Sequence, residues 1–253
     1  MVWFVGAGPG DPELITVKGQ KLLREADTVI YAGSLVNPAL LGETKAGCAI
    51  YNSATMTLEQ VIEIMVAEEK KGRKVVRLHT GDPSIYGAIR EQMDALRKRD
   101  ILFQVCPGVS AFCGAAAALK MEYTLPDVSQ SVILTRRAGR TPVREAENLE
   151  SLAQHGATMV IFLSTSMAEK VSADLIRGGY APETPAAIVY KATWPEEKTF
   201  RCTVETLGRT AKENHLTKTA LLIVGAAAGT GAYSKSCLYD ANFETEFRKG
   251  QKD

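Results

Sequence analysis

Short apolar runs alternate with amphipathic segments along most of the chain. In the first half, buried strands are predicted by the runs at 2–5, 28–31, 49–51, 74–79 and 102–105. Between these runs, apolar residues recur at helical spacing, as in Leu58, Val61, Ile62 and Met65. Alternation of this kind is typical of a mainly parallel sheet covered by helices. The first half is therefore predicted to form an α/β domain.

The second half repeats the alternation with one difference. Strands are expected at 132–135, 158–163, 186–191, 199–203 and 220–224. The short connection around 193–197 indicates a hairpin, so this sheet is expected to be mixed. A polar stretch at 123–130 is a suitable boundary. The predicted fold class is thus α/β, with domains at 1–120 and 121–230 and a tail at 231–253.

Three turns of the first domain, at 6–12, 80–84 and 107–111, each follow a strand and precede a helix. In a parallel sheet such turns emerge on one edge, where they can converge on one ligand. Gly81 lets a ligand approach the backbone closely. Asp82 and Pro83 suit the N-cap and first position of a helix. A plain strand-to-helix connection is the alternative interpretation of each turn.

The glycine-rich turn at 6–12 differs from a dinucleotide-binding loop. Its third glycine comes one place early, and Pro9 has no N–H to offer a pyrophosphate. The acidic residue expected at the end of the second strand is also missing, because that strand continues into Ala32, Gly33 and Ser34. The dinucleotide interpretation is therefore rejected, although the loop can still receive another ligand.

Composition narrows the function classes. Of the 253 residues 45% are hydrophobic, which is enough for one large domain or two smaller ones. A formal net charge of +1 argues against non-specific binding of nucleic acid. The five cysteines include no CxxC pair, so we expect no metal site and reduced thiols in the cytoplasm. Neither a signal peptide nor a membrane span is expected.

His79 has no visible partner and is interpreted as structural.

Two further features carry competing interpretations. Arg136, Arg137 and Arg140 follow a predicted strand closely, and such a loop either binds carboxylates or is simply solvated. The tail contains aromatic residues that are expected to dock on the body of the protein or on a second subunit, with a frayed end at 248–253.

Three segments resemble the signature motifs of one family, the tetrapyrrole (corrin/porphyrin) methyltransferases. These are VGAGPGDPELITVKG, RLHTGDPSIYGAIREQ and CPGVSAF. The resemblance covers nearly the whole chain. Within the family, SQSVILTRRAGRTPV and AAIVYKATWPEEKTFRCTV look most like the branch that methylates C-11 of precorrin-4 or cobalt-precorrin-4 in cobalamin biosynthesis. Thr80 stands where uroporphyrinogen methylases tend to have glycine, which argues against that reaction.

The resemblance implies two α/β domains with an active-site cleft between them, a homodimer, and S-adenosylmethionine as methyl donor. The implied donor contacts are Pro9, Thr80, Gly81, Asp82, Ile85, Ser110, Ala111, Leu163, Ala192 and Ala220. The substrate would be a small-molecule precorrin, whose acetate and propionate groups give Arg136, Arg137 and Arg140 a role in binding. No catalytic base is identified, and neither a nucleic acid nor a membrane is expected as a partner.

Three alternatives stay open or are disfavoured on stated grounds. A sibling enzyme of the family would methylate another precorrin carbon. Relatives that act on ribosomal RNA or on a modified histidine share the first motifs, but the near-neutral charge and the KATWP segment speak against them. From a different class, a non-catalytic nucleotide-binding module would use the same loops without turnover.

Overall fold

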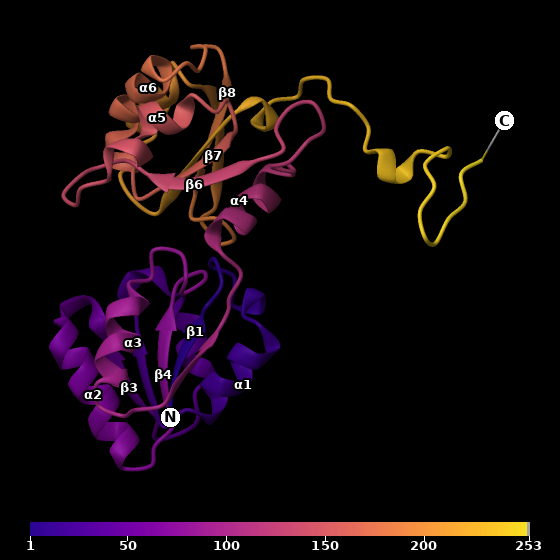
Figure 1. Ribbon diagram of the computed structural model, residues 1–253. Helices are drawn as coiled ribbons and strands as arrows, with labels where there is room; N and C mark the ends of the chain where they lie inside the picture. Colours follow the sequence, from indigo (N-terminus) through magenta and orange to yellow (C-terminus); the bar gives the residue numbers. More distant parts are fainter. Residues whose placement is uncertain (252–253) are drawn as a thin grey trace. The chain divides into compact units, whose positions relative to one another are not determined.

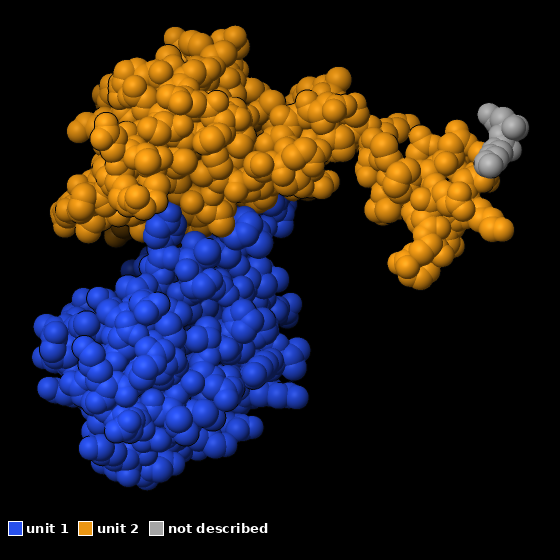
Figure 2. All heavy atoms as spheres, viewed as in Figure 1, with its two compact units in different colours: residues 1–118, 191–198 blue, residues 119–190, 199–253 orange. Residues whose placement is uncertain are grey.

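The computed structural model describes residues 1–251 and consists of two compact units. Unit 1 comprises residues 1–118 together with 191–198, and unit 2 comprises 119–190 and 199–253 (Figure 2). Lys252 and Asp253, the end of the predicted tail, lie outside the described residues. This division differs from the sequence-based one, because the short segment 191–198 groups with the first half of the chain and the predicted tail is part of unit 2. The boundary between the halves lies at residue 118 and not at residue 120.

Unit 1 is built on a parallel sheet with the strand order β3-β2-β4-β1-β5 (Figure 1). Its strands are β1 (Val2–Gly6), β2 (Thr28–Tyr31), β3 (Ala49–Asn52), β4 (Val75–His79) and β5 (Phe103–Cys106). All four strand pairs are parallel. The helices are α1 (Val17–Glu25), α2 (Leu58–Lys70), α3 (Ile89–Arg97) and α4 (Ala111–Leu119). The predicted first α/β fold is confirmed.

Both faces of this sheet are buried, because successive side chains along each strand point to opposite sides. One core contains Val5, Val29 and Leu78. The other contains Phe4, Ile30 and Val75 and is covered by residues of α2 and α3. Burial on both sides explains why these strands have continuous apolar runs in the sequence.

Unit 2 is a mixed sheet with the strand order β6-β7-β10-β8-β9. Its strands are β6 (Val132–Arg136), β7 (Thr158–Phe162), β8 (Pro185–Tyr190), β9 (Lys198–Thr203) and β10 (Ala220–Val224). The β6–β7 pair is parallel, whereas β10 runs antiparallel to both β7 and β8. The helices α5 (Leu149–Ala153), α6 (Ala168–Arg177) and α7 (Leu207–Glu213) pack on one core with these strands. The predicted mixed sheet is confirmed.

The predicted start of the helix after β4 is wrong. Asp82 is not its N-cap, since α3 begins only at Ile89 and its cap is Ala88. Residues 83–86 form a turn in which Tyr86 has φ 54°, and Ala88 follows with φ 50°. These left-handed conformations interrupt a right-handed helix, so the helix cannot begin earlier. Ile85 therefore lies in the turn and not on the apolar face of α3.

The tail does not bury its aromatic side chains on the body of the chain. Tyr239 is 83% exposed and Phe247 is 91% exposed. The segment is held by its own contacts, because the Arg248 guanidinium donates hydrogen bonds to the carbonyls of Leu238, Asp240 and Phe243. These two side chains are therefore not buried against the body, and contact with a second subunit, the other expected arrangement, stays a prediction.

A buried carboxylate fastens α2 to the sheet. Glu68 accepts hydrogen bonds from Lys71 Nζ at 2.7 Å, Arg73 Nη1 at 2.6 Å and the Thr28 hydroxyl at 3.0 Å. The bond from Lys71 is the main reason why the pKa of Glu68 is lowered to about 2, although burial acts in the opposite direction. A carboxylate with a lowered pKa stabilises the fold above its unfolded pKa, and the stabilisation is lost as the pH falls through the folded pKa.

We expect Glu68→Gln to lower the free energy of unfolding at pH 7 by about 1–3 kcal/mol, because three donors lose their ionised acceptor. The difference from the wild type should shrink as the pH falls from 4.5 towards 2. Urea unfolding at a series of pH values measures both quantities. Glu63→Gln on the exposed side of α2 is the control and should have little effect. A variant as stable as the wild type at pH 7 would contradict the prediction.

Candidate functional site

The loops after β4 and β1 meet at the carboxyl edge of the unit 1 sheet. The Ala7 N–H donates to the His79 carbonyl at 2.7 Å. Gly8 and Gly81 then exchange two backbone hydrogen bonds, of 2.8 and 3.3 Å, in an antiparallel bridge. Because β1 lies between β4 and β5, the loop after β5 emerges beside them. The structure thus brings together the three turns at 6–12, 80–84 and 107–111.

Glycines allow the three loops to touch through their backbones. A Cβ atom on Gly108 would lie 2.2 Å from the Gly81 carbonyl oxygen and 2.7 Å from Gly6 Cα. A Cβ atom on Gly6 would lie 2.6 Å from both Gly108 Cα and the Gly81 oxygen. Gly81 also has φ 58°, which favours glycine. The sequence indicates a close backbone approach at Gly81 alone, because the approach of Gly6 to Gly108 depends on two loops that are about a hundred residues apart.

Asp82 links the second loop to the third. Its Oδ2 accepts the Gly108 N–H at 2.8 Å, and its Oδ1 accepts the Ser84 N–H at 2.8 Å and the Ser84 hydroxyl. Burial acts to raise the pKa of Asp82, but the bonds from Ser84 and Gly108 outweigh it and hold the pKa below its ordinary value. The carboxylate is therefore ionised at neutral pH and places a fixed negative charge among the loops.

The segment 191–198, here called the strap, packs against the first loop. The Trp194 indole N–H donates to the Pro9 carbonyl at 3.0 Å. The Asp11 N–H donates to Thr193 Oγ1 at 2.9 Å. Ala192, a predicted donor contact, is buried in the same segment. From the sequence, this segment is predicted to be a hairpin connection that contains the methyl-donor contact Ala192 and part of a family motif, but no role is predicted for Trp194.

The residues predicted to contact the methyl donor fall into two groups. Those of unit 1 lie in the three loops, in the turn directly after the second loop (Ile85) or in the strap. They are Pro9, Thr80, Gly81, Asp82, Ile85, Ser110, Ala111 and Ala192. Leu163 and Ala220 belong to unit 2. Leu163 directly follows β7, is 68% exposed and has φ 53°. Ala220 begins the antiparallel strand β10, and the β7–β10 register continues to place it opposite Leu163. These two residues thus share one edge of the second sheet.

The predicted arginines lie at the same edge, because Arg136 pairs with Phe162 at the ends of β6 and β7. Arg136 donates to the carbonyls of Thr141 and Pro142, which closes its own loop. Arg137 forms an ion pair with Asp174 of α6 at 2.6 Å. Arg140 is exposed and, within residues 1–251, makes no hydrogen bond or ion pair. Of the three guanidinium groups, only that of Arg140 has all its donors available.

His79 lies at the end of β4 beneath the second loop. Its side chain is 4% exposed, and its Nε2 has no hydrogen-bond partner within the described residues. Burial, with a smaller effect from the charge of Arg77, lowers the pKa of His79 to about 3. The ring is therefore neutral at pH 7 and packs near Phe4, with 6.0 Å between ring centroids. A neutral, buried ring of this kind serves packing and is a poor proton acceptor at neutral pH.

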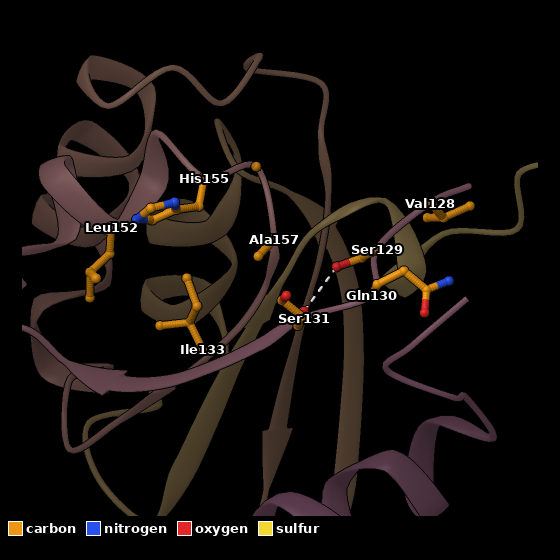
Figure 3. A pocket seen from close by; sticks show the side chains of 9 residues that line it. Val128, Ser129, Gln130, Ser131, Ile133, Leu152, His155 and Ala157 are labelled. Atoms are coloured by element: carbon orange, nitrogen blue, oxygen red, sulfur yellow. Dashed lines mark hydrogen bonds between the residues drawn. The ribbon is translucent and has the colours of Figure 1, made fainter. Parts of the chain in front are cut away.

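A cavity of about 510 Å³ in unit 2 lies elsewhere (Figure 3). Its lining includes Ser131, Ile133, His155 and Ala157, next to the first residues of β6 and β7. Arg136 and Leu163 lie at the last residues of those strands, so the cavity opens at the opposite edge of the sheet. No predicted site residue lines it.

Among the described residues, no group of three or more His, Cys, Asp or Glu side chains has the arrangement of a metal site. No helix in the same part of the chain has the length and apolar character needed to cross a membrane.

Comparisons with known proteins agree on one family. Residues 1–208 match the tetrapyrrole (corrin/porphyrin) methylases. Cobalt-precorrin-4 C(11)-methyltransferase of Methanocaldococcus jannaschii is 55% identical over 251 residues, covering 99% of this chain and 97% of that protein. Precorrin-4 C(11)-methyltransferase of Pseudomonas aeruginosa is 42% identical over 250 residues, covering 99% of each.

A solved structure agrees with the sequence comparisons. The X-ray structure of cobalt precorrin-4 methyltransferase, a cobalamin biosynthetic enzyme, matches with a TM-score of 0.88 and 46% identity. The match covers 90% of this chain and 95% of the other. With a family match over residues 1–208 and such identity over nearly all residues, the chain belongs to the tetrapyrrole (corrin/porphyrin) methylases.

Proposed function

We propose that the protein transfers a methyl group from S-adenosylmethionine to C-11 of precorrin-4 or cobalt-precorrin-4, in assembly of the corrin ring of cobalamin. The full-length similarity to the enzymes of M. jannaschii and P. aeruginosa supports this reaction. The observation that carries the proposal is the meeting of three loops at one sheet edge. Backbone bonds between Gly8 and Gly81 join the first loop to the second, and Asp82 joins the second to the third. These loops carry the three segments that resemble the family motifs.

The residues present suit a sulfonium donor better than a nucleotide phosphate. Pro9 removes an N–H from the loop that would otherwise hold a pyrophosphate. The loops offer glycine backbone to a ligand, and the ionised Asp82 favours a cationic one. When bound, S-adenosylmethionine supplies an activated methyl group, and its transfer to a ring carbon leaves S-adenosylhomocysteine.

The protein contributes chiefly by orienting its ligands. We assign the donor contacts to Pro9, Thr80, Gly81, Asp82, Ile85, Ser110, Ala111, Ala192, Leu163 and Ala220. Loops fixed to one another by backbone hydrogen bonds can hold a ligand in one orientation, and positioning of this kind can lower a barrier by up to about 7–11 kcal/mol. We assign binding of the precorrin carboxylates to the loop of Arg136, Arg137 and Arg140. Arg140 supplies the free guanidinium, and Arg136 holds the loop closed.

Isothermal titration separates this function from the alternative of a nucleotide-binding module. We expect S-adenosylhomocysteine to bind the protein tightly, and ATP and NAD not to bind. The physical reason is the first loop, which contains Pro9 at a position where phosphate binding needs N–H donors. Tight binding of ATP or NAD without binding of S-adenosylhomocysteine would overturn the proposed function.

A second experiment identifies the acceptor carbon. The protein is incubated with isotope-labelled S-adenosylmethionine and precorrin-4 made in situ, with and without cobalt, and NMR locates the new methyl group. Label at C-11 supports the proposal, and the two incubations distinguish the metal-free substrate from the cobalt form. Label at a different carbon would identify a sibling activity instead.

We further infer that the protein forms a homodimer and that it is located in the cytoplasm. The exposed aromatic side chains of Tyr239 and Phe247 are suitable for contact with a second copy. All five cysteines are free, as expected in a reducing compartment. Sedimentation equilibrium of the intact chain tests the oligomeric state, and a monomer at micromolar concentration would contradict the dimer.

A further inference from the structure

The strap has an unusual backbone for a connection between two strands. Lys191 has φ 46° and Thr193 has φ 67°. This region is sparsely populated by residues with a side chain, and for a β-branched residue such as threonine it is an outlier. The strap holds this shape through bonds of its own, from the Thr193 N–H to Glu197 Oε2 at 2.6 Å and from Lys191 Nζ to Glu196 Oε1 at 2.9 Å. Backbone in such conformations persists where the surroundings over-determine it, often at binding sites.

The strap makes its long-range hydrogen bonds to the first loop. Besides the bond from Trp194 to Pro9 and the bond from Asp11 to Thr193, the indole covers Gly10 so closely that a Cβ atom there would lie 2.1 Å from Trp194 Cδ1. On the other side, Gly114 of α4 leaves room for Pro9 and Thr193, which a Cβ atom there would meet at 3.0 and 3.1 Å. Pro9 is thus enclosed between the strap and α4.

From these contacts we infer that Trp194 and Thr193 are positioning residues for the methyl donor. They hold Pro9, Gly10 and Asp11 in the shape that the donor requires, without reacting themselves. The Trp194 indole N–H donates to the carbonyl of Pro9, and the Thr193 hydroxyl oxygen accepts the N–H of Asp11. This inference rests on the proposed function, because it concerns the same donor site.

Two variants remove one bond each with little change in shape. Trp194→Phe keeps an aromatic ring over Gly10 but loses the N–H donor, and Thr193→Val keeps the branched side chain but loses the acceptor. Trp3→Phe is the matched control, since Trp3 is the other tryptophan of the chain and lies in β1 with Lys18 over its ring. Titration with S-adenosylhomocysteine should give affinities about threefold to tenfold weaker for Trp194→Phe and for Thr193→Val, the loss expected for one hydrogen bond. The affinity of Trp3→Phe should equal that of the wild type.

Kinetics separate positioning from a general loss of structure. In both strap variants the KM for S-adenosylmethionine should rise, while the KM for the tetrapyrrole stays near the wild-type value. The Tm should fall by only about 2–4 °C, the effect of one hydrogen bond in a chain of this size. In the Trp3→Phe protein, Trp194 is the single tryptophan, so the fluorescence reports on Trp194 alone. Because its indole covers the first loop, its emission should change when S-adenosylhomocysteine is added.

The outcomes distinguish the two proposals. A wild-type protein that does not bind S-adenosylhomocysteine overturns the proposed function, and this inference with it. Normal wild-type binding together with strap variants that bind within twofold of it overturns the inference alone. Should Trp194→Phe fail to fold, Thr193→Val decides by the same criterion.

Discussion

Gly108→Ala is expected to lower the free energy of unfolding by about 1–3 kcal/mol or more, the range for adding atoms to a closely packed region. Binding of S-adenosylhomocysteine should fall at least tenfold. The new methyl group would lie 2.2 Å from the Gly81 carbonyl oxygen and 2.7 Å from Gly6 Cα. Both neighbours are backbone atoms, so no flexible side chain can move aside. Relief requires that the loops separate, which disturbs the hydrogen bond from Gly108 to Asp82.

Urea unfolding and isothermal titration measure the two effects of this substitution. Gly42→Ala is the matched control, because a Cβ atom on Gly42 has no other atom within 4 Å. It adds the same methyl group to the same unit and should leave stability and affinity close to the wild-type values. A Gly108→Ala protein that resembles this control in both measurements would show that the three loops are free to separate.

Asp82→Asn is expected to weaken binding of S-adenosylhomocysteine by about tenfold or more, since it removes the charge from the bond that joins the second and third loops and from the bonds within the second loop. The carboxylate accepts bonds from Gly108 on one oxygen and from Ser84 on the other. An amide of the same size has one oxygen, so its NH₂ group faces either the Gly108 N–H or the Ser84 N–H, and one bond is lost. The substitution also removes the negative charge that favours a cationic donor.

A short-range Asp turn outside the donor loops provides the control for this prediction. Asp240, in the tail, accepts one such bond on its carboxylate, from the Asn242 N–H at 2.8 Å. Asp240→Asn can keep that bond and should change the affinity little. If Asp82→Asn lowered the Tm but left the affinity for S-adenosylhomocysteine intact, Asp82 would have only a structural role in its turn.

The alternation of strands and helices could be predicted because burial leaves a strong periodic signal in the sequence. Val5, Val29 and Leu78 belong to apolar runs that are continuous because the unit 1 sheet is covered on both faces. Parallel strands then place all three glycine-containing turns at one edge, which the structure contains. The motifs alone were enough to predict which residues, from Pro9 to Ser110, belong to the three turns.

Contacts between distant residues could not be predicted from local patterns. Asp82 and Pro83 have the composition of a helix start, yet the Asp82 carboxylate accepts the Gly108 N–H from a distant loop. The helix α3 begins only at Ile89, after the left-handed residues Tyr86 and Ala88. In the same way, a dense group of arginines does not reveal that Arg137 pairs with Asp174, 37 residues further on. Trp194 and Pro9 are 185 residues apart, so neither segment indicates the other.

The strap belongs to unit 1 but lies in the second half of the sequence, and this affects how the protein folds during translation. A ribosome that has completed residues 1–118 has made the strands and helices of the first unit, but not the tryptophan that covers Gly10. The amino-terminal loop must therefore wait for about eighty more residues to be translated before it is complete, at the usual rates a delay of several seconds. For the same reason, a fragment ending at residue 118 would lack part of its own first loop's support, and the two halves would have to be supplied together in a split-protein reporter.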